Sequence, residues 1–216
     1  HTLESLRYRD FRFLWLSTLS VSGGFWTQMV VVGWLAYDRT GSPLLTSLVL
    51  GLDSLPFLIA GPVGGVLADT WDRRRLLMFG SVYQTLVTTV FATVLILDRG
   101  QTWHIFVFAF AMGLSWALTE PSKSALIPNL VPMSGLVNAF ALNTLAFGAS
   151  RLVMPLTGGA LVVAAGPGPT LLVSSTLYAT TFMTTRAIGP LAPREHVDGG
   201  PPPLRRFLEG ADYVRD

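Results

Sequence analysis

Long uncharged apolar stretches, separated by short charged patches, dominate this sequence of 216 residues. A helix crosses a bilayer core of about 30 Å with about 20 apolar residues, within a range of about 17–25. Four stretches reach that length, and two stretches near the short limit are flanked by charged or turn-forming residues into which a helix can lengthen. The pattern predicts an all-α integral membrane protein, a six-transmembrane-helix bundle. The predicted spans are 13–37, 44–68, 76–97, 103–119, 136–165 and 168–185.

The composition agrees with a membrane environment. Half of the residues are apolar, 13% are charged, and the mean hydropathy is +0.51. A water-soluble domain of this size would expose far too much apolar surface, so the lipid bilayer is the expected surrounding. Residues 1–190 form the predicted transmembrane domain. Residues 191–216 are rich in proline and glycine before a short amphipathic run, and we interpret them as the start of a central cytoplasmic linker.

The positive charges favour one side of the predicted membrane. When the amino terminus is placed in the cytoplasm, twelve of the 15 Lys and Arg residues lie on that side, against Arg39 and Arg99 outside. Cytoplasmic loops carry an excess of Lys and Arg. We therefore expect a multi-pass protein of the cell inner (plasma) membrane, with both termini of this chain cytoplasmic. The cytoplasmic residues are Arg7, Arg9, Arg12, Arg73, Arg74, Arg75, Lys123, Arg186, Arg194, Arg205, Arg206 and Arg215.

The predicted connections differ in length on the two sides. The outer connections, at 38–43, 98–102 and 166–169, are short, so the helices that they join are expected to be antiparallel neighbours. On the inner side, residues 120–134 form a longer predicted connection, which places Lys123 in a cytoplasmic loop.

A glycine, an aspartate and three arginines occur at fixed spacing between the second and third spans, in the run Gly65–Leu77. Gly65 has no side chain and lets another helix approach closely, while Asp69 lies where it can meet a nearby arginine or a helix amino terminus. Such contacts can hold the bundle in one conformation. The alternative is that the arginines only set the membrane topology, which leaves the glycine and the aspartate unexplained. The candidate gating residues are Gly65, Asp69, Arg73, Arg74 and Arg75.

The same run resembles the signature G-x-L-A-D-r-x-G-R-R-x-x-L of the major facilitator superfamily, and it lies in the cytoplasmic loop where that family carries it. The resemblance implies that the loop stabilises the outward-facing state against a helix from the other half of the transporter. Two positions depart from the signature. Thr70 stands where a basic residue is usual, and Asp72 stands where glycine is usual, so the signature does not fix the geometry of this turn.

Further runs are similar to the enterobactin-exporter and macrolide-efflux branch of that superfamily, and this similarity covers nearly the whole chain. Members have twelve helices in two six-helix halves, with the substrate path between the halves. The chain is thus interpreted as the amino-terminal half of a twelve-helix major facilitator fold and as a fragment of a longer transporter; a homodimer of halves is the alternative. The implied partners are a small-molecule substrate, protons, the lipid bilayer and a missing carboxy-terminal six-helix half. The similar runs begin at Arg9, Gly41, Pro121, Asn138 and Arg151.

Asp53 is the one acidic residue within the second predicted span. It lies about eight residues, or roughly 12 Å, from the outer end of that span. Ionisable residues inside a membrane usually face a bundle interior or a watery cavity. Asp53 is therefore a candidate for binding a proton or a cationic substrate. The alternative, of equal weight, is a structural hydrogen bond to a neighbouring helix.

Glu120 and Arg151 are candidates for an ion pair. Glu120 closes the fourth predicted span just before Pro121, and Arg151 lies near the middle of the fifth, which has its inner end close by. A pair would neutralise two charges in the membrane and could open when a substrate or a proton arrives. In the alternative, slightly favoured for Glu120, this carboxylate lies at the membrane surface, solvated or capping the helix. The resemblance supports Arg151, because similar sequences have an arginine at this place.

Gln28 and Asn143 are polar residues within predicted spans. Each is equally suited to lining a substrate cavity and to joining two helices by a hydrogen bond. The sequence has no phosphate-binding glycine-rich loop followed by Lys-Ser/Thr, its histidines are too scattered for a metal site, and it has no nucleophilic triad. We expect no enzyme, no cofactor, no metal site and no nucleic-acid partner.

These residues and the resemblance lead to one functional prediction. The protein is expected to be a secondary active transporter that exports a small, partly apolar molecule, such as a drug, a macrolide or a siderophore, by alternating access driven by proton entry. Proton coupling follows from the resemblance alone. The alternatives are uptake of a metabolite, and a membrane scaffold or assembly subunit that keeps the fold but transports nothing.

Overall fold

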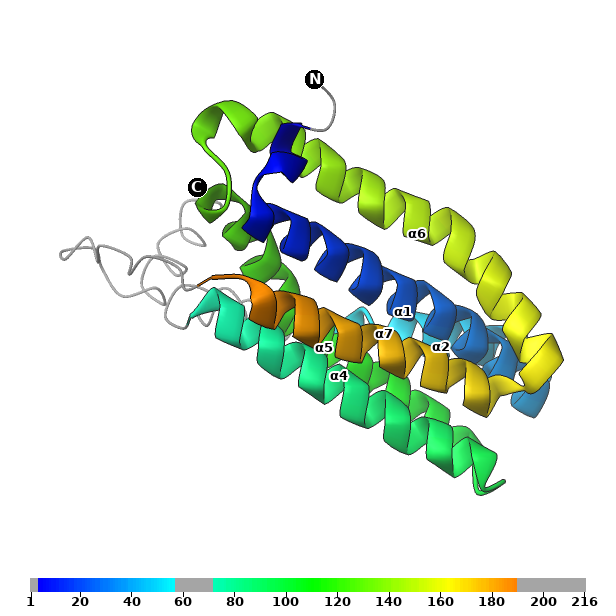
Figure 1. Cartoon of the computed structure of the whole chain (residues 1–216). Helices are drawn as coiled ribbons and strands as arrows, with labels where there is room; N and C mark the ends of the chain where they lie inside the picture. The colour runs from blue at the N-terminus through cyan, green and yellow to red at the C-terminus, as the bar shows by residue number, and fades with distance from the viewer. Residues whose placement is uncertain (1–3, 57–71, 190–216) are drawn as a thin grey trace, which may run out of the picture.

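The computed structural model describes residues 4–56 and 72–189 (Figure 1). Within these ranges the chain forms six α-helices and three short 3₁₀ turns and has no strand, which confirms the predicted all-α fold. Four of the described helical segments are long and apolar enough to cross a membrane. The α-helices are α1 (Arg9–Thr40), α2 (Pro43–Leu52), α4 (Arg73–Ile96), α5 (Thr102–Leu126), α6 (Leu136–Ala165) and α7 (Pro167–Ala187). The 3₁₀ turns are η1 (Glu4–Arg7), η2 (Ile127–Asn129) and η3 (Met133–Gly135).

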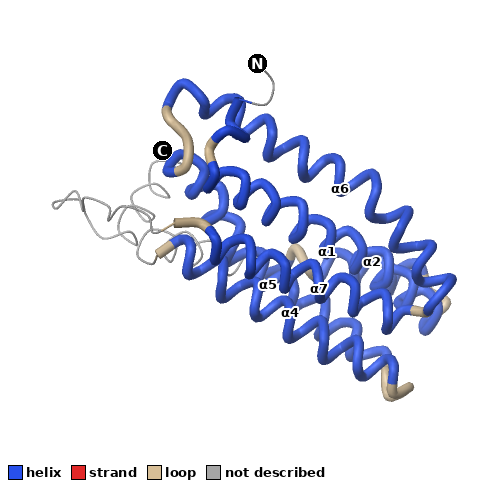
Figure 2. The backbone as a smooth tube through the Cα atoms, in the orientation of Figure 1, coloured by secondary structure: helices blue, strands red, loops and turns tan. Residues whose placement is uncertain are grey.

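The helices lie side by side in one bundle, and short turns join α1 to α2, α4 to α5 and α6 to α7 (Figures 1 and 2). Helix α1 packs against α7, α6 and α2, while α4 packs against α7 and α5. The amino-terminal ends of α1, α4 and α6 gather at the same end of the bundle as the carboxyl-terminal ends of α5 and α7 (Figure 1). The three pairs joined by short turns, α1–α2, α4–α5 and α6–α7, are all in contact, as predicted.

Two glycines shape the turns at the opposite end. Gly41 has a left-handed φ of 60° and its N–H donates to the Tyr37 carbonyl at 2.8 Å, which closes the last turn of α1. Ser42 then accepts a hydrogen bond from the Leu45 N–H at 3.3 Å and caps α2. Gly166, with φ of 87°, is the only residue between α6 and α7. Positive φ at both positions favours glycine.

The helix bounds differ from the predicted spans at two places. Helix α5 continues through Pro121 to Leu126, so the inner connection begins seven residues later than residue 120. Helix α2 ends at Leu52, followed by a turn at residues 53–54. Pro56 explains this break, because proline has no N–H to donate to the carbonyl of residue 52 and its ring crowds that carbonyl. The rest of the second predicted span lies outside the described residues.

Helix α7, which corresponds to the predicted span 168–185 and is not among the four segments apolar enough to cross a membrane, uses its hydroxyl groups in packing. The Ser17 and Thr185 hydroxyls lie 3.2 Å apart between α1 and α7. The Thr89 and Ser175 hydroxyls lie 2.6 Å apart between α4 and α7. Hydrogen bonds and small residues hold helices together in lipid, where apolar burial gives little driving force. Helix α7 therefore packs against both α1 and α4 and is joined to each by a hydrogen bond between hydroxyl groups.

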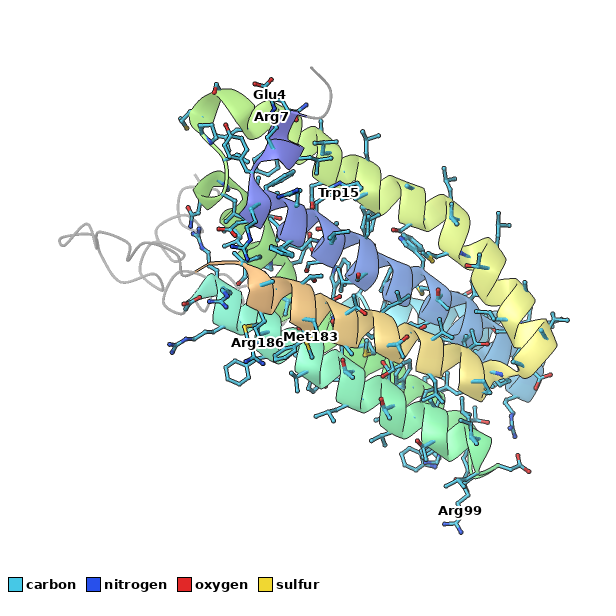
Figure 3. All side chains as sticks on the ribbon, in the orientation of Figure 1. Glu4, Arg7, Trp15, Arg99, Met183 and Arg186 are labelled. Atoms are coloured by element: carbon cyan, nitrogen blue, oxygen red, sulfur yellow. The ribbon has the colours of Figure 1, made fainter. Side chains whose placement is uncertain are left out.

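The outside of the bundle is apolar and its charges are unevenly placed. Large apolar side chains on α6, such as Val137 and Val163, are 83% and 88% exposed, which suits a lipid-facing or protein-facing surface. Figure 3 shows Glu4 and Arg7 at one end and Arg99 at the other. That first end also holds the start of α4 with its arginines and the end of α7 with Arg186.

Candidate functional site

The predicted gating residues are described in part, because Gly65 and Asp69 lie outside the described residues. Asp72, where the family signature has glycine, is the amino-terminal cap of α4. Its carboxylate accepts hydrogen bonds from the backbone N–H groups of Arg74 at 2.9 Å and Arg75 at 3.2 Å. Its φ of −62° does not require glycine. The departure from the signature thus gives α4 a capped start.

Two of the arginines join α4 to the carboxyl ends of neighbouring helices. Arg73 donates to the carbonyl of Ala125 in the last turn of α5. Arg74 donates to the carbonyls of Thr185 at 3.3 Å and Arg186 at 2.6 Å, in the last turn of α7. A guanidinium at a helix carboxyl end satisfies unpaired carbonyls and complements the helix dipole. Three helices are tied together at this end of the bundle.

Asp53 lies at the end of α2 with its backbone against α5. A methyl group added at Gly113 of α5 would overlap the Asp53 carbonyl, so the close approach requires glycine there. The half-buried Asp53 carboxylate accepts a hydrogen bond from the Ser54 hydroxyl at 3.1 Å. Among the described residues, the hydrogen-bond partner of this carboxylate is thus its own neighbour and not a residue of another helix.

Gln28 and Asn143 both bond across helix interfaces. Gln28 is 5% exposed, and its side-chain oxygen accepts a hydrogen bond from the Tyr178 hydroxyl of α7 at 2.9 Å. The side-chain oxygen of Asn143 accepts a hydrogen bond from the Thr18 hydroxyl of α1 at 2.7 Å. Both contacts correspond to the helix-joining alternative for these residues.

The suggested ion pair between Glu120 and Arg151 does not form. Glu120 instead pairs with Lys123, one helical turn further along α5, at 3.7 Å. The prediction placed Lys123 in a cytoplasmic loop, but its side chain is only 7% exposed and lies inside the bundle. The difference arises because α5 continues past Pro121, and the continuing helix turns Lys123 inward.

An aromatic cluster from three helices lies beside these charges. It consists of Phe25 and Trp26 on α1, Trp116 on α5 and Phe147 on α6. Each of these residues is at least about 15 Å from either end of its helix, at about 1.5 Å per residue. The ring centroids are 5.1 Å apart for Phe25–Trp26, 4.8 Å for Phe25–Trp116, 5.8 Å for Trp26–Phe147 and 6.3 Å for Trp116–Phe147.

Two cations border the aromatic cluster. The Arg151 guanidinium lies 5.3 Å from the centre of the Trp26 ring, and the Lys123 ammonium lies 5.9 Å from the centre of the Trp116 ring. Cations at this distance are attracted by the negative face of the ring. All four cluster residues are half-buried, while Arg151 is exposed. The cluster is thus a partly open aromatic surface between two positive charges.

A small cavity of about 20 Å³ lies behind Lys123, inside the bundle. Its polar lining comes from α1, α4, α5 and α7 and includes Ser17, Ser81 and Gln84 besides the Glu120–Lys123 pair. A cavity with this volume and several polar partners can hold one water molecule. In residues 4–56 and 72–189, no group of three His, Asp or Glu side chains is arranged to hold a metal ion.

Neither the aromatic cluster nor the inward-facing side chain of Lys123 is predicted from the sequence. Aromatic residues are frequent in membrane spans, and nothing in their spacing shows that rings on three helices meet. For Lys123 there was a signal, since Glu120 and Lys123 are three residues apart and form a favourable pair if the helix continues. Pro121 concealed that signal, because proline usually marks a helix boundary.

Bundle and site together define a multi-pass α-helical membrane protein with an ionisable, aromatic surface in the middle of its helices. Residues 1–198 match the family model described as transmembrane secretion effector, and the chain belongs to this family of the major facilitator superfamily. The match confirms the resemblance seen in the sequence.

Several curated transporters are similar to the chain. The uncharacterized MFS-type transporter YfiS of Bacillus subtilis is 26% identical over 147 residues, which are 68% of this chain and 34% of the relative. Macrolide efflux protein A of Streptococcus pyogenes is 28% identical over 105 residues, 49% of this chain and 26% of the relative. Multidrug efflux pump Tap of Mycolicibacterium fortuitum is 22% identical over 173 residues, 77% of this chain and 42% of the relative. The aligned region covers less than half of each of these relatives.

Proposed function

We propose that this chain contributes one six-helix half of a secondary active transporter that exports small, partly apolar molecules of the drug, macrolide or siderophore type. The aromatic cluster carries the proposal. Aromatic rings at mid-depth bind apolar molecules, and the bordering charges orient them. Two relatives named for efflux, of macrolides and of multiple drugs, support export.

The substrate path would lie between this half and a second six-helix half. Alternating access in such folds is a rocking of one half against the other around a central site. The aromatic cluster comes from α1, α5 and α6, so these three helices would line the path. Both termini of this chain would be cytoplasmic, since the arginine-rich end of the bundle would face that side.

The arginines at the start of α4 would have two different roles, one within this half and one toward the second half. Arg73 and Arg74 are bonded to α5 and α7 within this half. The Arg75 side chain is 78% exposed, and its pair with Asp72 is loose at 4.0 Å. Arg75 would therefore meet the second half and help to hold the outward-facing state, together with Gly65 and Asp69.

Proton coupling would use the carboxylates within the membrane. Glu120 has a 35% exposed side chain and pairs with the inward-facing Lys123, so protonation of Glu120 would release Lys123 from its partner. Asp53 is the second candidate, at the break in α2. Antiport is the resulting scheme, in which protons enter as substrate leaves.

The test is transport by the full-length gene product reconstituted in lipid vesicles that contain a pH indicator. A macrolide, a planar aromatic drug and a catecholate siderophore are offered in turn under an imposed proton gradient. We expect flux of at least one compound together with a matching change of internal pH. Flux without a pH change would remove proton coupling. Neither flux nor pH change across the panel would favour the scaffold.

Variants assign the coupling residue. Glu120→Gln and Asp53→Asn are compared with Glu4→Gln, which removes an exposed carboxylate of η1 outside the helices that line the path. We expect a loss of pH-dependent flux in Glu120→Gln and unchanged flux in the control. Unchanged pH dependence in both Glu120→Gln and Asp53→Asn would exclude these carboxylates.

A further inference from the structure

Arg151 carries a positive charge in the middle of a membrane-spanning helix. It lies about 22 Å from either end of α6, at about 1.5 Å per residue. Its side chain is exposed, and within the described residues it contacts the Trp26 ring at 5.3 Å and pairs with no carboxylate. A charge at that depth is costly unless it faces a watery cavity or meets an opposite charge.

The groups around Arg151 are hydrogen-bond donors. A guanidinium has five N–H donors and no acceptor. The indole Nε1–H of Trp26, on the ring that Arg151 covers, is buried and has no hydrogen-bond partner in the part of the chain that the structure describes. This place in the bundle therefore offers donors and aromatic faces. A negatively charged acceptor would complement it.

The other charges facing the aromatic cluster do not change that balance. Lys123 is the second cation, and it is neutralised by Glu120 at 3.7 Å. Among Arg151, Lys123 and Glu120, one positive charge, that of Arg151, is left over.

We propose, resting on the proposed export function, that Arg151 and the aromatic cluster bind the anionic group of an aromatic amphiphile, a carboxylate, sulfonate, phosphate or phenolate attached to a planar apolar body. The guanidinium binds such an anion with two parallel hydrogen bonds. The apolar body stacks on the rings of the cluster. Cationic compounds of the same shape are repelled by Arg151.

The test is binding to the full-length gene product in nanodiscs of zwitterionic lipid, measured by equilibrium dialysis. The two probes share one ring system and differ in charge: naphthalene-2-sulfonate and 2-naphthyltrimethylammonium. We expect the sulfonate to bind the wild-type protein at least about tenfold more tightly than the ammonium, a ratio that one charged hydrogen bond supplies. Arg151→Gln should abolish that preference, and Arg151→Lys should keep part of it.

Controls separate the site from non-specific attraction. Arg99→Gln removes an arginine at one end of the bundle, away from the aromatic cluster, and should leave both affinities unchanged. Trp26→Leu should weaken both probes because it removes a ring, and the sulfonate more, because it also removes the indole N–H donor. Equal affinities of the two probes for the wild-type protein, or sulfonate binding unaffected by Arg151→Gln, would overturn the proposal. Sulfonate binding that does not depend on Arg151 is also the result expected if a carboxylate elsewhere in the protein forms an ion pair with Arg151.

The site and the transport activity can fail separately, because binding needs no gradient. Charge-selective binding that depends on Arg151, without flux of any compound, would support the anion site and refute the export function. Proton-linked flux limited to cationic compounds and insensitive to Arg151→Gln would keep export and remove the anion site.

Discussion

Removal of the Glu120 charge should destabilise this bundle more than removal of both charges of the Glu120–Lys123 pair. The Lys123 side chain is 7% exposed, so without Glu120 its ammonium would be a buried charge with no counter-ion. Breaking a fully buried pair from one side costs about 3–5 kcal/mol. Glu120 itself is 35% exposed and already partly solvated, and we therefore expect about 2 kcal/mol for Glu120→Gln.

Lys123→Met, the single change on the other side, should cost about 1 kcal/mol, because the remaining carboxylate can reach water. The double variant should cost no more than Lys123→Met alone, since it leaves no buried charge. The assay is thermal unfolding of the purified protein in detergent, at one scan rate, followed by tryptophan fluorescence. For 150–250 residues about 1 kcal/mol shifts the midpoint by about 2–4 °C, so Glu120→Gln should unfold about 4–8 °C lower. Additive effects of the two single changes would refute this account of the pair.

Three further changes test the packing by the same assay. Asp72→Ala removes the cap of α4 and should cost about 1 kcal/mol. Tyr178→Phe leaves the buried oxygen of Gln28 without its donor and should cost about 1–3 kcal/mol. Gly113→Leu forces α5 away from the Asp53 backbone and should cost about 1–3 kcal/mol or more, as overpacking does, and it should also reduce the yield of folded protein.

Matched controls accompany these changes. Asp38→Ala removes an exposed carboxylate, Tyr83→Phe removes the hydroxyl of an exposed side chain, and Gly51→Leu adds a side chain where no described residue lies within 4 Å. Each control should change the midpoint little, as surface changes usually do by less than about 0.5 kcal/mol. If a control lowers the midpoint as much as its test variant does, the corresponding cap, hydrogen bond or glycine contact does not stabilise the bundle.

A helix end was predicted correctly from the sequence where a residue type that ends helices, such as glycine, follows the apolar stretch. The span at 136–165 coincides with α6, because Gly166 adopts a positive φ and ends it. The ends of α2 and α5 were misplaced for opposite reasons. Pro56 breaks α2 within an apolar stretch, whereas Pro121 is accommodated inside α5. Whether a proline breaks a helix depends on its neighbours in space, which apolar periodicity does not reveal.

For the candidate site, single residues could be predicted from the sequence, but the contacts between them could not. Arg151 and Glu120 stood out as charges within apolar stretches, and the structure places both beside the aromatic cluster. Their partners depend on which side chains of α1 and α5 turn toward them. Trp26, the partner of Arg151, lies 125 residues away in the sequence, and no local pattern connects the two.

The contacts within this half also bear on how it would move. Rocking of one half against another requires that each half stay rigid. Hydroxyl pairs join α7 to α1 and α4, and Arg73 and Arg74 tie α4 to the ends of α5 and α7. The surface that would line the path is different, because Arg151 is exposed and the rings of the aromatic cluster are only half-buried. The ties inside the bundle would let this half move as one rigid body. The donors of Arg151 and Trp26 would let it bind an anion at the surface around which it moves.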